Sequence, residues 1–203
     1  MLENISGYNL ILASNSPRRN ELLNGLGVKY SVKTLKNVDE SYPAELKGAD
    51  VALYIASKKA EAFRNHMKSN DLVITADTIV CKDDQIFGKP TDRADAVRML
   101  QALSGAIHWV FTGVCLTSLK DFKSFTVGTE VTFSSLTEDE INYYIDHYKP
   151  LDKAGAYGVQ EWIGFVGVER ISGSYFNVMG LPVHKLYTTL KDFVPYSEVI
   201  YPL

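Results

Sequence analysis

Hydrophobic residues follow two different spacings along the chain, so the sequence predicts both strands and helices. Continuous or alternating apolar runs predict strands at 28–35, 72–75, 108–116 and 125–133. Apolar positions three to four residues apart predict helices at 17–23, 49–67, 94–103, 141–145 and 183–193. The segment 81–90 predicts a hairpin that turns at Asp83-Asp84, and 196–203 is expected to be a tail. Thr137 with Glu140 predicts a capping box that opens the helix at 141–145.

The stretch from Ile11 to Arg19 places two arginines where a helix begins. Residues 14–16 are typical of turns and caps, and Pro17 suits the first helical position. A helix carries partial positive charge at this end, which favours acidic side chains. Arg18 and Arg19 would be unfavourable there unless an anion such as phosphate binds beside them. The alternative is that both arginines point into water and pair with surface carboxylates.

The predicted helix at 49–67 carries a lysine in the middle of its apolar stripe. Lys59 lies centrally among the apolar positions, whereas Lys58 lies at their edge. A lysine on an apolar face either extends its ammonium group to the surface or meets a buried partner. If Lys59 has a functional role, its buried partner would be a phosphate.

Carboxylates occur at two places that suit chemistry. Asp77 interrupts the apolar run between 72–75 and 79–81, where a charge is costly unless it is hydrogen-bonded or metal-bound. It is either a β-bulge or turn aspartate, or a catalytic carboxylate at the end of a central strand. Asp39 and Glu40 lie in a turn-rich segment and are either solvated or ligands of a divalent cation.

Composition limits the classes of protein that remain. The 203 residues predict one domain, 1–203, with ordinary globular values of 22% charged and 46% hydrophobic residues. A net charge of −3 argues against a nucleic-acid or membrane-surface protein. The start has no apolar run of signal-peptide length, and nowhere do ~18 consecutive apolar residues occur. Two cysteines in strand-like runs suggest reduced core residues, so we expect a cytoplasmic location.

Together, the charged residues predict a phosphoanhydride hydrolase. Cationic groups would hold a polyphosphate, and carboxylates would bind a divalent ion and activate water. Lys89, fixed between Gly88 and Pro90, and the glycine-rich loop 151–160 could complete a ligand site. No Walker motif, GxGxxG or GxSxG pattern is present, which excludes those routes to nucleotide or acyl chemistry.

The opening ILASNSPRR resembles the signature of the Maf family of nucleoside triphosphate pyrophosphatases. Further blocks resemble that family in the same order, from residue 9 to about residue 192: ADTIV (76–80), GKP (88–90), LSG with HWVFTGV (103–114), LDKAGAYGVQ (151–160) and NVMGLP (177–182). The resemblance implies the Maf/ITPase-like α/β fold, a mixed elongated sheet flanked by helices, with two lobes and a cleft. It also implies hydrolysis of a nucleoside triphosphate to the monophosphate and pyrophosphate, with Mg²⁺ or Mn²⁺ as cofactor.

The resemblance also implies roles for particular residues. Asp77 matches the proton acceptor and, with Glu40, the metal ligands; the phosphate cluster includes Ser14, Arg18, Arg19, Lys59 and Lys89. Arg18, Thr78 and Gln160 match the residues that distinguish the branch acting on dTTP and UTP. Glu161 and Trp162 depart from the pattern, because many members have glycine after the glutamine.

The family is also associated with arrest of septum formation, so a non-catalytic nucleotide-binding regulator of cell division is the rival reading. Retention of Asp77, Glu40 and both lysines disfavours it, because a binder needs no positioned base. The partner expected is a small-molecule nucleoside triphosphate, and the sequence leaves the oligomeric state open, a homodimer included.

Overall fold

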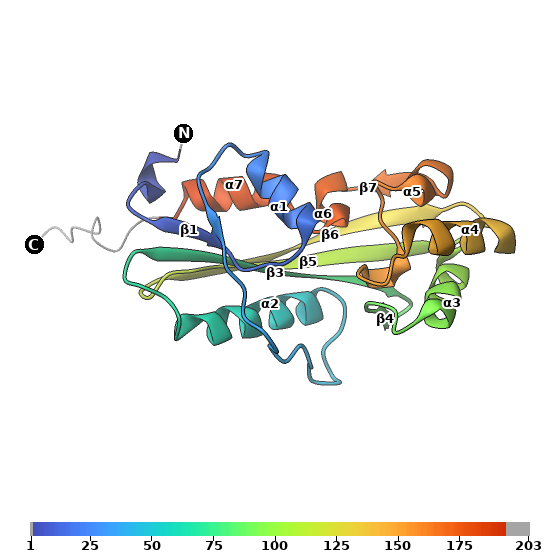
Figure 1. The fold of residues 1–203 in the computed structure, drawn as a ribbon, viewed down its shortest axis with the longest axis horizontal. Helices are drawn as coiled ribbons and strands as arrows, with labels where there is room; N and C mark the ends of the chain where they lie inside the picture. The colour runs from blue at the N-terminus through green and yellow to red at the C-terminus, as the bar shows by residue number, and fades with distance from the viewer. Residues whose placement is uncertain (1, 194–203) are drawn as a thin grey trace, which may run out of the picture.

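A computed structural model describes residues 2–193, and the expected tail at 196–203 lies outside them. An elongated mixed sheet runs along the molecule (Figure 1). Its strands follow the order β2-β1-β3-β5-β6-β7, and β4 pairs with β3. Only β1 is parallel to its two neighbours. The strands are β1 (Asn9–Leu12), β2 (Ser31–Val32), β3 (Asp71–Lys82), β4 (Gln85–Phe87), β5 (Ile107–Thr117), β6 (Phe122–Phe133) and β7 (Val168–Ser172).

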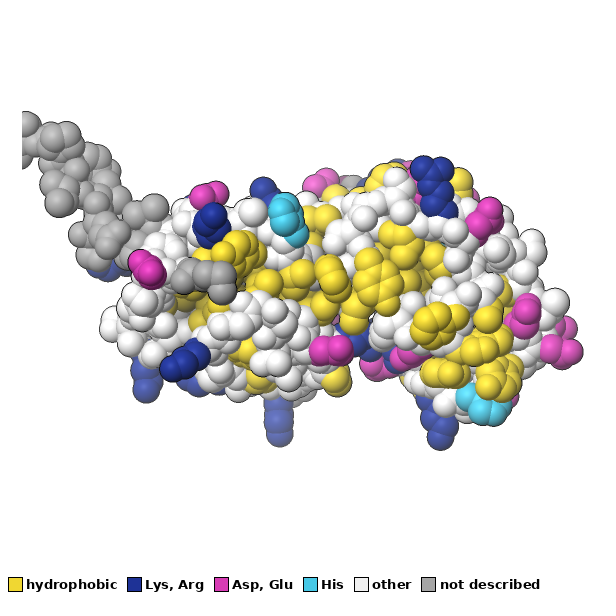
Figure 2. Space-filling model, turned by 90° about the horizontal axis from the view of Figure 1, so that it is seen from above, with side chains coloured by type: hydrophobic (Ala, Val, Ile, Leu, Met, Phe, Trp, Pro, Cys, Tyr) yellow, Lys and Arg dark blue, Asp and Glu magenta, His cyan; other side chains and the backbone are white. Residues whose placement is uncertain are grey.

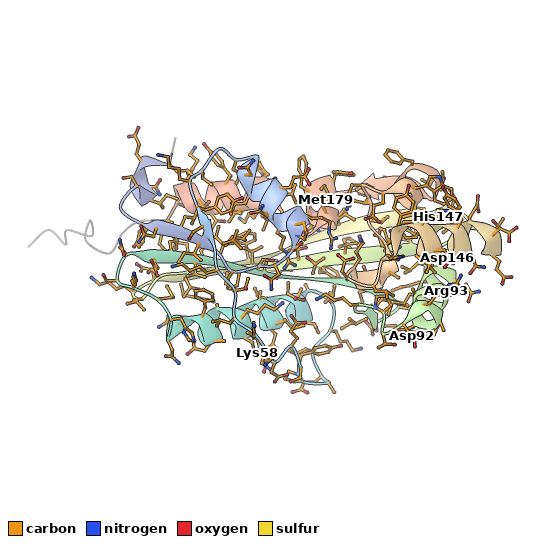
Figure 3. The ribbon with its side chains drawn as sticks, in the orientation of Figure 1. Lys58, Asp92, Arg93, Asp146, His147 and Met179 are labelled. Carbon is orange, nitrogen blue, oxygen red and sulfur yellow. The ribbon has the colours of Figure 1, made fainter. Side chains whose placement is uncertain are left out.

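Helices cover both faces of the sheet, as the α/β prediction requires. On one face lies α2, while α1, α6 and α7 lie on the other (Figure 1). The helices are α1 (Pro17–Asn24), α2 (Ala49–Arg64), α3 (Arg93–Leu103), α4 (Glu138–Tyr148), α5 (Trp162–Val166), α6 (Tyr175–Met179) and α7 (Val183–Lys191), with 3-10 turns η1 (Glu3–Ile5) and η2 (Ala154–Ala156). At one end, Arg93 of α3 donates to both carboxylate oxygens of Asp146 in α4, at 2.7 and 2.8 Å (Figure 3).

One edge of β3 lacks a neighbour in its middle, and this gap positions the site. The pairing with β1 ends at Ile74, and the pairing with β4 begins at Val80. On the other edge, β5 pairs with β3 without interruption from Val73 to Cys81. Because successive side chains of a strand point to opposite faces, Asp77 faces α2 and Thr78 faces α1 and α6. A ligand at the open edge can therefore reach side chains from both faces of the sheet.

Local sequence signals predicted several features correctly. Ser16 caps α1, with Pro17 as its first residue, and Thr137 and Glu140 form the capping box of α4. The hairpin turns at Asp83 and Asp84, whose φ angles of 49° and 64° fit a two-residue turn between antiparallel strands.

Three expectations were wrong. The predicted strand at 28–35 is reduced to the two residues of β2, and the helix predicted to extend to residue 67 ends at Arg64. Asp77 is neither in a bulge nor at a strand end, because β3 continues through it in regular register with Gly113. The carboxylate is accommodated because the opposite edge of the strand is open at this point.

Close packing of α2 against β5 fixes the height of α2 over the sheet, and it generates a first prediction. A Cβ at Gly113 would lie 2.5 Å from the Ala52 carbonyl oxygen and 2.6 Å from the Leu53 Cα. Because both atoms are backbone, Gly113→Ala is expected to lower the free energy of unfolding by about 2–3 kcal/mol in urea titrations. Gly7→Ala is the control, since no atom lies within 4 Å of a Cβ there. Equal midpoints for the two variants would contradict the packing argument.

Candidate active site

A cleft of about 840 Å³ opens beside the unpaired edge of β3. It contains the residues that the sequence predicted for the site, except Asp39, although they come from six separate segments of the chain. In Figure 2 the molecular outline is indented between its two halves, with basic and acidic side chains in the indentation. The cleft is lined by Ser14, Arg18, Arg19, Glu40, Lys59, Asp77, Thr78, Lys89 and Gln160, among others.

Lys59 meets two carboxylates rather than extending to the surface. Its ammonium nitrogen lies 2.6 Å from Asp77 Oδ1 and 2.7 Å from Glu40 Oε1. The side chains of Lys59 and Asp77 are only 17% and 13% exposed. The central position of Lys59 on the α2 stripe therefore points it through the helix-sheet interface to the open edge of β3.

The segment 33–48 carries Glu40 to this position, crossing from β2 to the α2 side of the sheet (Figure 1). Lys58 holds the segment down by bonding to Asp39 Oδ2 at 2.6 Å and to the Ser41 carbonyl at 2.9 Å (Figure 3). Burial raises the pKa of Glu40, but the hydrogen bond and charge of Lys59 outweigh it, helped by Lys89 and Arg19. The pKa of Glu40 thus lies below its usual value, which keeps the carboxylate ionised at neutral pH.

Arg19 closes the gap in the sheet on the other face. Its guanidinium donates to the Ala76 carbonyl at 2.8 Å, the Gly180 carbonyl at 2.8 Å and Thr78 Oγ1 at 3.0 Å. Burial lowers the pKa of Arg19, and the charges of Asp77 and Glu40 oppose this shift. Much of its hydrogen-bonding capacity is used by the protein, so its contribution to an anion site is mainly its charge.

Arg18 has a different partner from those of Arg19, because it is held by the loop after α4. Its Nη1 lies 3.0 Å from Asp152 Oδ2, and the other oxygen of Asp152 accepts from Lys153 at 2.8 Å. Lys153 also lies 3.1 Å from Glu161, whose other oxygen accepts from the Tyr144 hydroxyl. The two arginines thus have separate surroundings, and an ionic chain connects Arg18 to the residue next to Gln160.

The first turn of α1 contributes backbone and hydroxyl groups to the cleft. Ser14 is 8% exposed and its Oγ accepts from the Ser16 N–H at 3.2 Å, which fixes the turn before the helix. Ser16 then caps the helix by accepting from the Arg19 N–H. This places the positive end of the α1 dipole at the cleft.

The loop 151–160 forms one wall of the cleft. At Gly155, φ is +67° and a Cβ would lie 2.8 Å from Val80, so the glycine is explained by the turn and its packing. Gln160 ends the loop, and its Oε1 is buried without a hydrogen-bond partner among residues 2–193. An unpaired buried acceptor is costly, so this oxygen is available to a ligand donor.

The charge of the cleft suits a polyphosphate with a bound cation. Of the described lining residues, five are basic and three are acidic, although the whole chain has a net charge of −3. Within residues 2–193, no three His, Cys, Asp or Glu side chains gather to hold a metal alone. Glu40 and Asp77 do converge on one cationic nitrogen, and Mg²⁺ often takes one or two carboxylates with substrate oxygens and water completing its shell. These two residues therefore fit a metal that binds together with its substrate.

Sequence reasoning missed several residues that hold the site together. Asp152 and Glu161 anchor the loop that carries Gln160, and the Gly180 carbonyl and Thr112 surround Thr78. Asp152, Thr112 and Gly180 lie in the family-like blocks and Glu161 departs from the pattern, but nothing in the local sequence identified their partners.

Comparisons with known proteins identify the family of this chain and several relatives. The family described as Maf-like protein matches residues 9–193. A dTTP/UTP pyrophosphatase of Phocaeicola vulgatus is 61% identical over 94% of this chain and 99% of that protein. One from Bacteroides fragilis (strain ATCC 25285) is 60% identical over 95% of this chain and 100% of that protein. Among solved structures, a HAM1 protein from Coxiella burnetii has a TM-score of 0.47 and 14% identity, over 92% of this chain and all of that one.

The two neighbouring lysines of α2 should differ in their effect on turnover. Lys59→Ala leaves Asp77 and Glu40 without their shared cation, so kcat/KM for a nucleoside triphosphate should fall about 10²–10³-fold. Lys58→Ala removes a partly exposed pair with Asp39, so a fall of less than about tenfold is expected. Steady-state kinetics and melting temperatures of both variants decide between catalysis and packing; equal losses would show that Lys59 has only a structural role.

Proposed function

Because the chain belongs to the Maf family, we propose that it is a nucleoside triphosphate pyrophosphatase that hydrolyses dTTP and UTP. The products are the nucleoside monophosphate and pyrophosphate. The observation that carries the proposal is the convergence of Asp77 and Glu40 on Lys59 inside a cleft with an excess of basic side chains. The names of close full-length relatives supply the substrates.

The polyphosphate binds along the basic side of the cleft in this proposal. The N-terminus of α1, Arg18 and Lys89 present positive charge to the cleft from different directions. Lys89 is exposed and its charge acts on Glu40, so it lies near the carboxylates that face the reacting phosphate. These groups counter the negative charge of the phosphates in the ground state and the transition state.

Asp77 is the proton acceptor for the water that adds across the bond between the α- and β-phosphates. It sits on a regular strand, and Lys59 holds its Oδ1 at 2.6 Å, so the direction of the carboxylate is fixed before substrate binds. Preorganisation of this kind is what makes a single carboxylate effective as a general base.

Glu40 and Asp77 would hold a divalent cation, Mg²⁺ or Mn²⁺. The ammonium of Lys59 now lies between them, which shows that the two carboxylates already face a common position for positive charge. When bound, such an ion supplies Lewis-acid stabilisation of the phosphate oxygens.

The base is recognised by uncharged and cationic hydrogen-bonding groups of the same cleft. Gln160 offers an unpaired Oε1 as well as an amide donor, Arg18 offers donors, and Thr78 offers a hydroxyl. Thymine and uracil present an imino N–H between two carbonyl oxygens, which such a set can satisfy. Cytosine and the purines present different edges and would leave some of these groups unpaired.

A cytoplasmic location also belongs to the proposal. It is supported by Cys81 and Cys115, which are both buried and not joined in a disulfide. No helix within residues 2–193 has the length and apolar character needed to cross a membrane.

Product analysis tests the function directly. With dTTP and Mg²⁺ or Mn²⁺, the protein should release pyrophosphate and dTMP, and EDTA should abolish release. Asp77→Asn should retain the fold and lose about 10²–10⁴-fold in rate, because the general base is gone. Asp83→Asn, in the exposed hairpin turn, is the matched control and should keep the parent rate.

Other outcomes of the same assay contradict the proposal in distinct ways. Release of inorganic phosphate would indicate a phosphomonoesterase. Tight nucleotide binding without turnover would favour the non-catalytic regulator. Parent-like turnover by Asp77→Asn would remove Asp77 from the reaction.

Base selectivity should depend on Gln160. In the parent, kcat/KM for dTTP and UTP should exceed that for ATP and GTP, and Gln160→Ala should narrow the gap by about tenfold, since one unpaired buried group costs ~1–3 kcal/mol. Steady-state kinetics on all four nucleotides measures the ratio. A uniform loss on every substrate would mean that Gln160 only braces its loop.

A further inference from the structure

A second polar network lies on the face of the sheet opposite Asp77. Thr112 of β5 stands directly opposite Thr78 of β3, and their hydroxyl oxygens are 2.9 Å apart. Thr112 is fully buried, whereas Thr78 reaches the cleft. Behind Thr112 lies the backbone carbonyl of Asn177 in α6, at 3.2 Å from its Oγ1. A chain of hydrogen bonds thus connects the cleft to the protein interior.

The direction of this chain follows from counting hydrogens. The carbonyl of Asn177 can only accept, so Thr112 donates its single hydroxyl hydrogen to it. In the pair between Thr112 and Thr78, the donor must then be Thr78. The opposite direction would leave Thr78 donating to the Gly180 carbonyl over 3.5 Å, which is long for an O–H···O bond.

The acceptor behind Thr112 is held rigidly. The Asn177 carbonyl also accepts from the Gly180 N–H at 3.0 Å. The side-chain amide of Asn177 donates to the Val110 carbonyl and to Thr129 Oγ1, both at 3.0 Å. Because Asn177 is bonded to two strands and is fully buried, Thr112 meets a fixed acceptor.

On the cleft side, Arg19 donates to Thr78 Oγ1 at 3.0 Å. The Thr78 hydroxyl thus donates its hydrogen to Thr112, and one of its lone pairs accepts the hydrogen bond from Arg19. What remains for a ligand is one lone pair, so this hydroxyl faces the cleft only as an acceptor.

We propose that Thr112 is a positioning residue for base selection, because it sets the hydrogen-bond polarity of Thr78. The acceptor so created matches the imino N–H of uracil or thymine. It opposes cytosine, whose ring nitrogen at that place is itself an acceptor. This inference rests on the proposed function, and it adds the rejection of cytidine nucleotides through a residue outside the cleft.

The test is the ratio of kcat/KM for UTP to that for CTP. Thr112→Val keeps the shape and removes the hydroxyl, which frees the hydrogen of Thr78 to point at the ligand. The ratio should fall about three- to tenfold, with a gain on CTP accounting for part of the change. Thr112→Ser retains the hydroxyl and should restore the parent ratio.

Thr75→Val is the matched control. Thr75 is a fully buried threonine of β3 on the α2 face, where its hydroxyl donates to the Ala56 carbonyl at 2.8 Å. The Thr75→Val variant should lose about as much stability as Thr112→Val, but it should leave the UTP-to-CTP ratio of kcat/KM unchanged. If Thr112→Val does not fold, Thr112→Ala provides a smaller variant without the hydroxyl, and equilibrium binding of UMP and CMP provides the same ratio without turnover.

The outcomes of this test distinguish the role of Thr112 from the proposed pyrophosphatase activity. A parent that releases pyrophosphate from UTP, with an unchanged ratio in folded Thr112→Val, overturns the role of Thr112 and leaves the function intact. Equal losses on both nucleotides also overturn it, because a purely structural residue would behave that way. A parent inactive on UTP overturns both.

Discussion

Between Ile74 and Val80, one edge of β3 has no strand beside it among the described residues, and the site depends on this gap. Unpaired backbone groups away from water are costly, so a buried gap of this kind needs another partner. Arg19 supplies one by donating to the Ala76 carbonyl, while it also bonds to the Gly180 carbonyl. The gap is thereby stable, and it leaves Asp77 and Thr78 accessible from one cleft although they face opposite sides of the sheet.

The charged groups at the gap fit the proposed function better than a role in stability. Burying ions costs several kcal/mol each, and a mutual ion pair often only offsets that cost. Lys59 with Asp77 and Glu40 is therefore weak evidence for a stabilising device. The same three groups make sense as preorganised electrostatics, because they need little rearrangement when a charged substrate arrives.

The sequence indicated candidate site residues more readily than the contacts between them. The caps of α1 and α4 and the Asp83-Asp84 turn follow from local signals, and all were predicted correctly. The mixed sheet was also predicted correctly, but from the family resemblance. The inward position of Lys59 also follows from helical spacing, but its partner Glu40 comes from an irregular segment with no periodicity. The partners of Arg19 lie 57 and 161 residues away, so no local pattern could distinguish an anion ligand from a residue that closes the sheet.

Thr112 is a second residue whose tertiary partners the local sequence does not show. Its place in a β-strand was predictable, since it lies within the apolar run 108–116, but a threonine in a strand gives no sign of hydrogen-bond direction. That direction emerges only when the register of β3 with β5 and the carbonyl of α6 are known together.

In the proposed function, the two faces of β3 differ in the kind of interaction that they offer a ligand. On the α2 face, Lys59, Glu40 and Asp77 would act on phosphates through full charges, whose effects extend over several ångströms. On the other face, neutral hydroxyl and carbonyl groups behind Thr78 act only at hydrogen-bond distance, where the sign of each donor and acceptor decides the fit. In this proposal, catalysis and base selection therefore depend on physically different interactions, separated by one strand. A change on one face can then alter selectivity while the charged cluster on the other stays in place.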